Sequence, residues 1–526
     1  MREDSSRYNK KTMRFMWLSV AALTMVALFS RMKGLNPPSL FIDDLWQGLL
    51  SGAALADQFR LRSSAPLGFT SLLGTALRFI PDPEISLQMI PFLAGLAVIP
   101  VMALVIFRIT KNPPASVLGA ALVTCAPPMA ELSVRVKQYT LDALLVAVLL
   151  LLAIFVGEEK KRFPVFVIVA LTFLLFSFSS AVVAVLLITT FAVAQPRHLY
   201  EAAQNRRIFI HLVLFMTVTG LYYVLVLKGQ KNPALENFWS GYFPGTVEAF
   251  FSGLFSLFRS LSPTPGILSP PGAEIFSLLF SFVLILLAVT GAVCLWRKPG
   301  YRWLGAGLVL LYPVLGILAL LHLYPLGGGR TDLFTYPVTI LLVATGLARV
   351  FEGEYLRTRR MDWTTLICGL TALPFCLPMA LGPQITYPTG GNLPEIVSRA
   401  KAALGPADGL IILPHCSFCF AYYSDWPVSL EPCDFYATGF NPVIHKPNVH
   451  ILPGLVGYGQ HPEILIPEMK RIVDRGYPGL VFFTMDIGAS NYIDRYLIRA
   501  GYCPVKKIEN KSIVYVTVYR RQRISD

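Results

Sequence analysis

The chain has 526 residues, of which 54% are hydrophobic and only 14% charged, and its mean hydropathy is +0.58. A soluble protein of this length needs more polar surface, so the composition excludes that class and indicates a polytopic membrane protein. The net charge of +14 does not indicate a nucleic-acid partner, because the basic residues fall mostly in short loops between apolar runs, where they set membrane topology.

The N-terminal residues 1–14 are polar and basic, and the first apolar run is Phe15–Phe29. A cleaved signal peptide is the competing interpretation. No small-residue cleavage site follows, and many more apolar runs do. We therefore expect a membrane anchor whose N-terminus lies in the cytoplasm, in an integral protein of the plasma (inner) membrane.

Residues 31–88 are expected to form a long first outer loop. Two amphipathic pieces within it, near 45–56 and 67–80, are too polar or too short to span and are predicted to lie in the outer interface.

Ten further apolar runs follow, and together with the first they predict about eleven spans of roughly 15–20 residues. An odd number of spans places the C-terminus outside. The further runs are Pro91–Phe107, Ser116–Ala130, Leu141–Val156, Pro164–Phe178, Ala181–Ala194, Ile208–Leu227, Ile275–Leu295, Leu304–Leu321, Leu333–Ala348 and Thr364–Leu381.

From about residue 385 the pattern changes to short apolar strands alternating with helices. The fold class is therefore a helical polytopic membrane domain, residues 1–384, followed by an extracytoplasmic α/β domain, residues 385–526. The predicted strands are Gly409–Leu413, Gly479–Phe483 and Ser512–Tyr519, and the predicted helices are Leu393–Leu404, Pro462–Arg475 and Asn491–Ala500.

Two adjacent carboxylates, Asp43 and Asp44, follow the first span at a predicted membrane–water interface. Ionisable groups are costly near hydrocarbon, so this pair is a candidate functional site. A solvated loop is the structural alternative, as is an N-cap at Asp44 for a helix beginning at Leu45.

Most basic residues are predicted to lie on the cytoplasmic side, but the topology places several of them on the outer side. Retained beside carboxylates, they indicate an anionic ligand such as a phosphate. Pairing with Asp43, Asp44, Asp142 or lipid headgroups is the alternative. These cations are Arg60, Arg62, Arg135, Lys137 and Arg330.

Asp142 opens the fourth span, where a carboxylate is favoured by the helix dipole. It could equally serve as a metal ligand or as a partner of Lys137.

Four cysteines, Cys416, Cys419, Cys433 and Cys503, lie in the predicted outer domain, and we expect one or two disulfides among them. A metal site at His415-Cys416-x-x-Cys419 is the alternative, although the second pair lacks metal-site spacing. The cysteines within spans, Cys125, Cys294, Cys368 and Cys376, are expected to behave as small apolar residues.

The chain contains no phosphate-loop pattern, nucleotide-binding fingerprint or Ser-His-Asp signature. A transferase that acts outside the cytoplasm has no nucleotide sugar available, so it would need a lipid-borne donor.

The ordered set of motifs resembles the GT-C class of lipid-dependent membrane glycosyltransferases. The nearest groups are the protein O-mannosyltransferases and the lipid A aminoarabinose transferases, with the bacterial glycosyltransferase families 39 and 83. The resemblance covers the whole membrane part. It is carried by Asp43-Asp44, Ala65-Pro66-Leu67, Arg135-x-Lys137-x-Tyr139-x-x-Asp142 and Tyr324-Pro-Leu-Gly-Gly-Gly-Arg330.

This resemblance implies that Asp43 is the catalytic base and that Asp44 positions the acceptor. The family usually has Asp-Glu at this place, which leaves the division of roles between Asp43 and Asp44 open. Where many relatives carry Lys or His with a double proline, this chain has Ser64-Ala65-Pro66, and Arg62 is expected to substitute.

The expected donor-phosphate contacts are Arg62, Arg135, Lys137, Tyr139 and Arg330. Some relatives use a divalent metal ion, for which Asp142 is the candidate ligand.

The predicted function is inverting transfer of a sugar from a polyprenyl-phosphate donor to a glycan, lipid or protein acceptor outside the cytoplasm, with membrane lipid as a further partner. The alternatives are a transporter or flippase for lipid-linked glycans and a non-catalytic factor of envelope-glycan assembly. A transporter would predict inverted repeats, interrupted helices and charges near the bilayer midplane.

Overall fold

A computed structural model of the chain describes residues 10–35, 37, 39–61, 63–194, 202–230, 233–262, 270–327, 329–351, 368, 391–433, 436–452, 465–484, 487–509 and 514–522. The chain divides into two compact units. The helical unit comprises Met1–Leu35, Gln88–Val224 and Gly241–Thr386, and the sheet unit comprises Asn36–Leu87, Leu225–Ser240 and Tyr387–Asp526. The predicted domain boundary at 384/385 and the last predicted span, Thr364–Leu381, lie outside the described residues.

The chain is a multi-pass membrane protein. Its described part contains seven helices that are long and apolar enough to cross a membrane. They overlap α1 (Lys10–Met32), α5 (Pro83–Thr110), α8 (Tyr139–Glu158), α11 (Ala202–Tyr222), α15 (Pro270–Arg297), α16 (Arg302–Leu320) and α17 (Tyr336–Phe351). Many large apolar side chains on these helices, such as Leu18, Leu279 and Leu286, are exposed, as a lipid-facing surface requires.

Three further predicted spans form shorter helices in the helical unit. These are α6 (Pro113–Cys125), α9 (Phe163–Phe173) and α10 (Phe178–Ala194). The predicted span Ser116–Ala130 is wrong as a single helix. Pro127 and Pro128 lack the amide hydrogens that would continue α6, so the chain bends at Ala126 and a separate helix α7 (Pro127–Leu132) begins.

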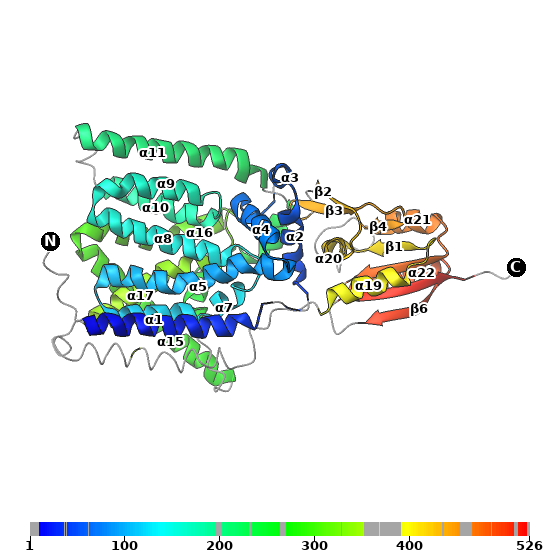
Figure 1. Cartoon of the computed structure of the whole chain (residues 1–526), viewed down its shortest axis with the longest axis horizontal. Coiled ribbons are helices and arrows are strands. Elements are labelled where there is room, and N and C mark those ends of the chain that lie inside the picture. Colours follow the sequence, from blue (N-terminus) through cyan, green and yellow to red (C-terminus); the bar gives the residue numbers. More distant parts are fainter. Residues whose placement is uncertain are drawn as a thin grey trace. The chain divides into compact units, whose positions relative to one another are not determined.

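The core of the helical unit is a continuous apolar cluster that runs through these helices. Figure 1 shows them side by side. Helices α13 (Pro233–Trp239) and α14 (Val247–Arg259) lie between the predicted spans Ile208–Leu227 and Ile275–Leu295. Helix α13 belongs to the sheet unit and α14 to the helical unit.

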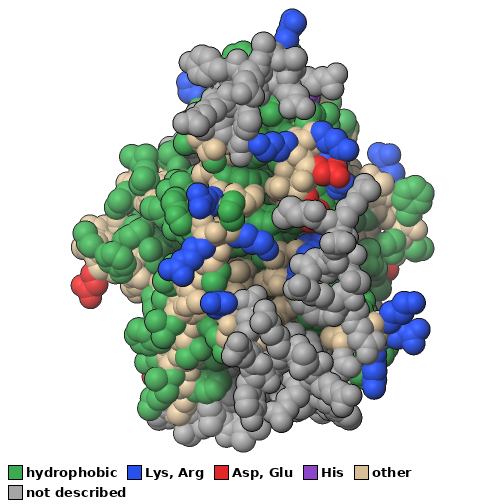
Figure 2. All heavy atoms as spheres, turned by 90° about the vertical axis from the view of Figure 1, so that its left-hand side faces the viewer, with side chains coloured by type: hydrophobic (Ala, Val, Ile, Leu, Met, Phe, Trp, Pro, Cys, Tyr) green, Lys and Arg blue, Asp and Glu red, His purple; other side chains and the backbone are tan. Residues whose placement is uncertain are grey.

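Basic side chains gather at the end of the helical unit where α1 begins, and acidic ones are sparse there (Figure 2). They come from the start of α1, the end of α5, the α8–α9 and α15–α16 links and the end of α17. They include Lys10, Lys11, Arg108, Lys160, Lys161, Arg162, Arg297, Lys298, Arg302 and Arg349.

The first predicted loop folds into three helices, α2 (Ile42–Gly52), α3 (Leu55–Arg60) and α4 (Leu67–Phe79). The predicted amphipathic piece near 67–80 coincides with α4, whereas the piece near 45–56 is divided between the end of α2 and the start of α3. Helix α2 begins at Ile42, so Asp44 lies inside its first turn, and the N-cap position belongs to Phe41.

The C-terminal part is an α/β domain, as predicted. A five-stranded sheet has the order β4-β1-β5-β7-β6, and a separate hairpin pairs β2 with β3. The strands are β1 (Gly409–Ile412), β2 (Val428–Pro432), β3 (Phe440–Ile444), β4 (Val449–Ile451), β5 (Gly479–Thr484), β6 (Tyr502–Glu509) and β7 (Tyr515–Arg521). Strands β4, β1 and β5 are parallel, whereas β7 is antiparallel to both β5 and β6.

Helices cover both faces of this sheet. Leu480 and Phe482 of β5 share a buried cluster with residues of α21 (Ile466–Asp474) and α22 (Ile487–Arg499). On the other face the ring of Phe483 lies edge-on to that of Phe420 in α20 (Pro414–Tyr423), 5.3 Å away. Because β5 is buried on both faces, its sequence is a continuous apolar run, which is why it could be predicted.

The disulfides predicted for the C-terminal domain are wrong. Cys416, Cys419 and Cys503 are unpaired thiols, so no disulfide joins the four predicted cysteines. Cys416 and Cys419 lie one turn apart in α20, and burial raises the pKa of both thiols, which favours the neutral form over the thiolate that a metal requires. Cys125, expected to be a small apolar residue, is disulfide-bonded.

Candidate functional site

The acidic pair lies in the first turn of α2, where unsatisfied backbone amides and the helix dipole favour negative charge. Asp44 is fully buried, whereas Asp43 is half-buried. Asp44 opens a buried run that continues to Gly48, whereas Asp43 lies just before that run. Asp43 is therefore the carboxylate of the pair that a ligand can reach more easily.

Trp46 holds the carboxylate of Asp43. Its indole Nε1 donates a hydrogen bond to Asp43 Oδ1 over 3.3 Å. The indole ring in turn lies edge-on to Phe440 of β3, with ring centroids 6.3 Å apart. Aromatic contacts of this kind orient a side chain, so the α/β domain fixes the group that positions Asp43.

Helix α2 also packs closely on α20. A methyl group built on Gly48 would lie 2.8 Å from the ring of Tyr422, so this position has room only for glycine. The Leu40 amide, just before α2, donates to Tyr423 Oη over 2.9 Å. The acidic pair thus belongs to one folded unit with the C-terminal domain.

The sequence predicted two phosphate-binding cations in the first loop, Arg60 and Arg62. Arg62 lies outside the described residues. Arg60, at the end of α3, pairs with Asp57 over 3.4 Å and donates to the Leu430 carbonyl over 3.3 Å. Arg60 is therefore explained by local pairing, but with Asp57 and not with the carboxylates Asp43, Asp44 or Asp142 that the sequence suggested as partners.

Arg135 and Lys137 lie in the segment 133–138, which joins α7 to α8 without forming a helix. They are only 6% and 5% exposed, and Tyr139 at the start of α8 is also buried. A buried cation is stable only with an anionic or strongly polar partner. The segment therefore brings two buried positive charges to the start of α8.

Asp142 belongs to a buried hydroxyl network in the same unit. Ser179, in the first turn of α10, donates to Asp142 Oδ2 over 3.4 Å and lies 3.2 Å from Tyr324 Oη. Tyr324 donates to the Thr331 carbonyl over 2.6 Å, and burial raises the pKa of Tyr324 well above its ordinary value, so the hydroxyl keeps its proton. Asp142 Oδ1 has no hydrogen-bond partner, which leaves one oxygen for a ligand hydroxyl.

The sequence analysis missed Asp332, which lies beside this network. It is fully buried, and its Oδ2 accepts a 2.7 Å hydrogen bond from the Gly327 amide. Gly327 has φ +81°, a conformation that favours glycine. The sequence could have indicated Asp332, because this carboxylate stands directly before the apolar run that begins at Leu333. In the structure it lies in the 3-10 helix Thr331–Thr335, which leads into α17. Arg330 precedes that helix and is half-buried.

The structure brings the predicted residues together in two groups. Asp43 and Asp44 belong to the sheet unit, and Arg135, Lys137, Tyr139, Asp142 and Arg330 belong to the helical unit. Across the residues that the structure describes, no three His, Cys, Asp or Glu side chains gather as a metal site would require. The neighbours of Asp142 named above are hydroxyls, a poor set for a divalent ion, so no step below uses a metal.

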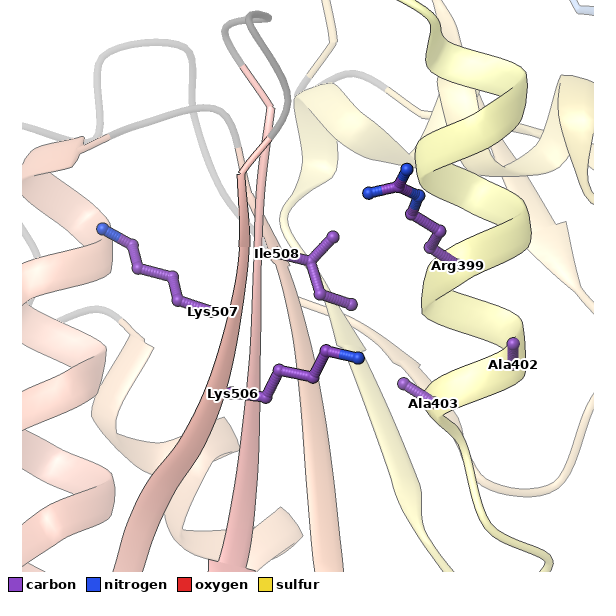
Figure 3. Close-up of a pocket in the computed structure, with 6 residues that line it drawn as sticks. All are labelled: Arg399, Ala402, Ala403, Lys506, Lys507 and Ile508. Atoms are coloured by element: carbon purple, nitrogen blue, oxygen red, sulfur yellow. The ribbon is translucent and has the colours of Figure 1, made fainter.

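A basic hollow of about 370 Å³ lies between α19 (Leu393–Ala403) and β6. Figure 3 shows the Arg399 and Lys506 side chains beside it and Lys507 pointing away. Side chains alternate along a strand, so Lys506 and Ile508 share the face of β6 that α19 covers. The hollow is lined by Arg399, Ala402, Ala403, Lys506, Lys507 and Ile508.

Comparisons with known proteins give a likeness of fold. No family model matches the chain, and no curated protein matches it. The solved structure of ArnT from Cupriavidus metallidurans in the apo state is 13% identical, covers 95% of this chain and 97% of its own, and has a TM-score of 0.41. The structure of the same protein bound to undecaprenyl phosphate is 11% identical, with the same coverage and TM-score. ArnT is an aminoarabinose transferase of the GT-C class.

Proposed function

We propose that this chain is a membrane glycosyltransferase. It moves one sugar from a polyprenyl-phosphate donor to an acceptor hydroxyl on the outer side of the membrane, with inversion at the anomeric carbon. The observation that carries the proposal is the half-buried Asp43 carboxylate, held by Trp46 beside the fully buried Asp44.

Inverting transfer needs a carboxylate within reach of the acceptor hydroxyl. In the proposed step Asp43 removes the hydroxyl proton as the acceptor oxygen attacks the anomeric carbon. The new glycosidic bond forms while the bond from that carbon to the phosphate oxygen breaks, and polyprenyl phosphate leaves with the electron pair. Asp44, buried in the same helix turn, is proposed to position the acceptor.

The leaving phosphate needs positive charge where its own negative charge develops. Arg135 and Lys137 supply it in this proposal, because both are buried and held in one short segment. Tyr139, Arg62 and Arg330 remain proposed contacts of the same phosphate. Asp142 is proposed to accept a hydrogen bond from a hydroxyl of the donor sugar through its unpartnered Oδ1.

The placement of charges favours a transferase over a transporter. A transporter holds charged side chains near the middle of its spans. In the described spans, the acidic, lysine and arginine side chains lie near helix ends, as Arg31, Asp142, Glu158, Arg297 and Arg349 illustrate.

The basic end of the helical unit is proposed to face the cytoplasm, since positively charged loops are retained there. The α/β domain is then proposed to lie outside, where only a lipid-borne donor is present.

The proposal is tested with purified full-length protein and a panel of polyprenyl-phosphate sugars, by measuring released polyprenyl phosphate. Asp43→Asn should lower turnover by about 10²–10⁴-fold, the usual loss for a general base. Folding should be unaffected, because asparagine still accepts the Trp46 hydrogen bond.

Asp57→Asn is the matched control, since Asp57 is a solvent-exposed acid in the same loop. It should keep full turnover. Full turnover of Asp43→Asn would refute the proposed base, and flipping of a lipid-linked glycan without any release of polyprenyl phosphate would establish the transporter instead.

A further inference from the structure

Arg31 is a buried cation for which the described residues provide no hydrogen-bond acceptor or ion-pair partner. It lies in the last turn of α1 and is 0% exposed. None of its three guanidinium nitrogens has a hydrogen-bond acceptor. No acidic residue of the described chain forms an ion pair with it, so none of the described residues neutralises this charge.

The guanidinium lies against the backbone of α5. A methyl group built on Gly95 would lie 3.1 Å from Arg31 Nη1 and 2.6 Å from the Cβ of Ser133. Gly95 therefore leaves the room that the guanidinium occupies, and Ser133 packs against the same glycine.

Polar contacts fix this end of α1. The amide of Gln88 donates to the Gly34 carbonyl over 3.2 Å and to the Val134 carbonyl over 2.6 Å. The segment after α7 is thus tied to the turn that follows Arg31. Arg135 and Lys137 come next in that segment and are also buried.

An ionised group removed from water without a partner costs several kcal/mol, so a folded protein retains one only where something else supplies the opposite charge. The guanidinium carries five hydrogen-bond donors in a fork that matches the oxygens of a phosphate. It sits at the end of a membrane span, the depth at which lipid phosphates lie.

We propose that Arg31 binds a lipid-borne phosphate, with Arg135 and Lys137 of the adjoining segment contributing to the same anion site. Ser133 belongs to the segment 133–138, which forms no helix, so a phosphate reaches the guanidinium by displacing a bend. If the lipid is the polyprenyl carrier, the inference rests on the proposed function and adds a donor-binding residue to it. An anionic phospholipid would be the other source of the same group.

Binding, not turnover, is the readout. Full-length protein in detergent is titrated with polyprenyl phosphate, with the neutral polyprenol that lacks the phosphate, and with phosphatidylglycerol. Arg31→Met should weaken binding of a phosphate lipid by about 10–100-fold, as expected for a charged hydrogen-bond pair. Polyprenol binding should not change between variants.

Two variants make the result specific. Arg31→Lys keeps the charge but not the fork and should lose less affinity than Arg31→Met. Arg259→Met removes an exposed arginine from the last turn of α14 and should bind like wild type. Asp43→Asn should also bind normally, so failure of the transferase proposal would not mimic failure of this one.

Each outcome decides a point. A loss of affinity for polyprenyl phosphate alone supports the site with the polyprenyl carrier as its ligand. A loss of affinity for phosphatidylglycerol alone, or an equal loss for both lipids, supports the site with bulk phospholipid as a source of the phosphate. Unchanged binding of both phosphate lipids by a folded Arg31→Met would overturn the proposal. A higher melting temperature of that variant would then show that Arg31 is an uncompensated buried charge. If Arg31→Met does not fold, Arg31→Lys is used instead: weaker binding of a phosphate lipid supports the proposal, and unchanged binding overturns it.

Discussion

Trp46 orients the carboxylate of Asp43, the proposed catalytic base. A carboxylate on a helix surface can adopt several rotamers, but the hydrogen bond from the indole to Asp43 favours one of them. The ring itself cannot turn freely, because it packs against Phe440. The reactivity proposed for Asp43 thus depends on a residue about four hundred positions along the chain.

His450 provides a prediction at the same scale. The ring is buried in β4, and its Nε2 lies 2.9 Å from Tyr477 Oη. Burial, with a further contribution from Arg475, lowers the pKa of His450 to about 4, whereas an unfolded chain keeps about 6.5. Below pH 6.5 the unfolded chain therefore binds a proton that the folded chain does not.

The stability contributed by neutral His450 is consequently complete above pH 6.5 and declines as the pH falls towards 4. The sheet should lose about 2 kcal/mol between pH 7.5 and pH 5. Hydrogen exchange of the β1 amides in the full-length protein, corrected for the intrinsic effect of pH, measures this loss. His450→Gln should show much less of it, and an identical pH dependence in both proteins would contradict the assignment.

Helices α15 and α17 show how elements of the helical unit approach. A methyl group built on Gly291 would lie 1.9 Å from the Leu342 carbonyl oxygen, and one built on Gly346 would lie 2.0 Å from the Leu287 carbonyl oxygen. The two glycines are reciprocal, so the helices cross with their backbones in contact. In lipid, where no hydrophobic force drives helices together, such close packing is a main source of association.

Gly291→Val should therefore separate these helices. The obstacle is backbone, which cannot rotate away, so the loss should be at least the 1–3 kcal/mol typical of overpacking. Thermal unfolding of the full-length protein in detergent measures it.

Gly220→Ala is the matched control for this helix crossing. It also lies in a helix, but a methyl group there meets no atom within 4 Å, so it should be neutral or slightly stabilising. Equal melting temperatures for Gly291→Val and wild type would show that the helices do not touch at these glycines.

The whole molecule has an uneven distribution of charge. Basic side chains gather at the end of the helical unit where α1 begins, and the links there are short (Figure 2). A short basic loop is hard to translocate, so the sum of these loops decides orientation more strongly than any one of them.

Orientation is therefore predictable for the entire chain. A phosphatase reporter that is active only outside the cytoplasm should be active when fused after Asp526 and inactive when fused after Lys160, in the α8–α9 link. Reporter activity in intact cells measures this. Activity at Lys160 with none at Asp526 would reverse the orientation and remove the reason for a lipid-borne donor.

The sequence alone was enough to predict those helices and strands in which nearly all residues are surrounded by apolar groups. Long apolar runs gave α5, α8 and α15, and the doubly buried β5 was equally clear, because lipid and a sheet interior both select apolar side chains at every position. Edge strand β6 was missed, since its exposed Lys506 and Lys507 and the bulge between Pro504 and Lys506 obscure any alternation. The acidic pair was found because charge beside a span is costly and therefore conspicuous.

Only the tertiary structure decided which side chains meet. Contacts between distant positions decide the hydrogen bond of Ser179 to Asp142 and the packing of Phe440 on Trp46. They also decide that no disulfide joins the four cysteines of the C-terminal domain. Arg31 resembled an ordinary residue at the end of a span until its burial and its lack of acceptors were known. The physical reason is that composition records the average environment of a segment, whereas chemistry depends on the distance between particular atoms that only the packed chain fixes.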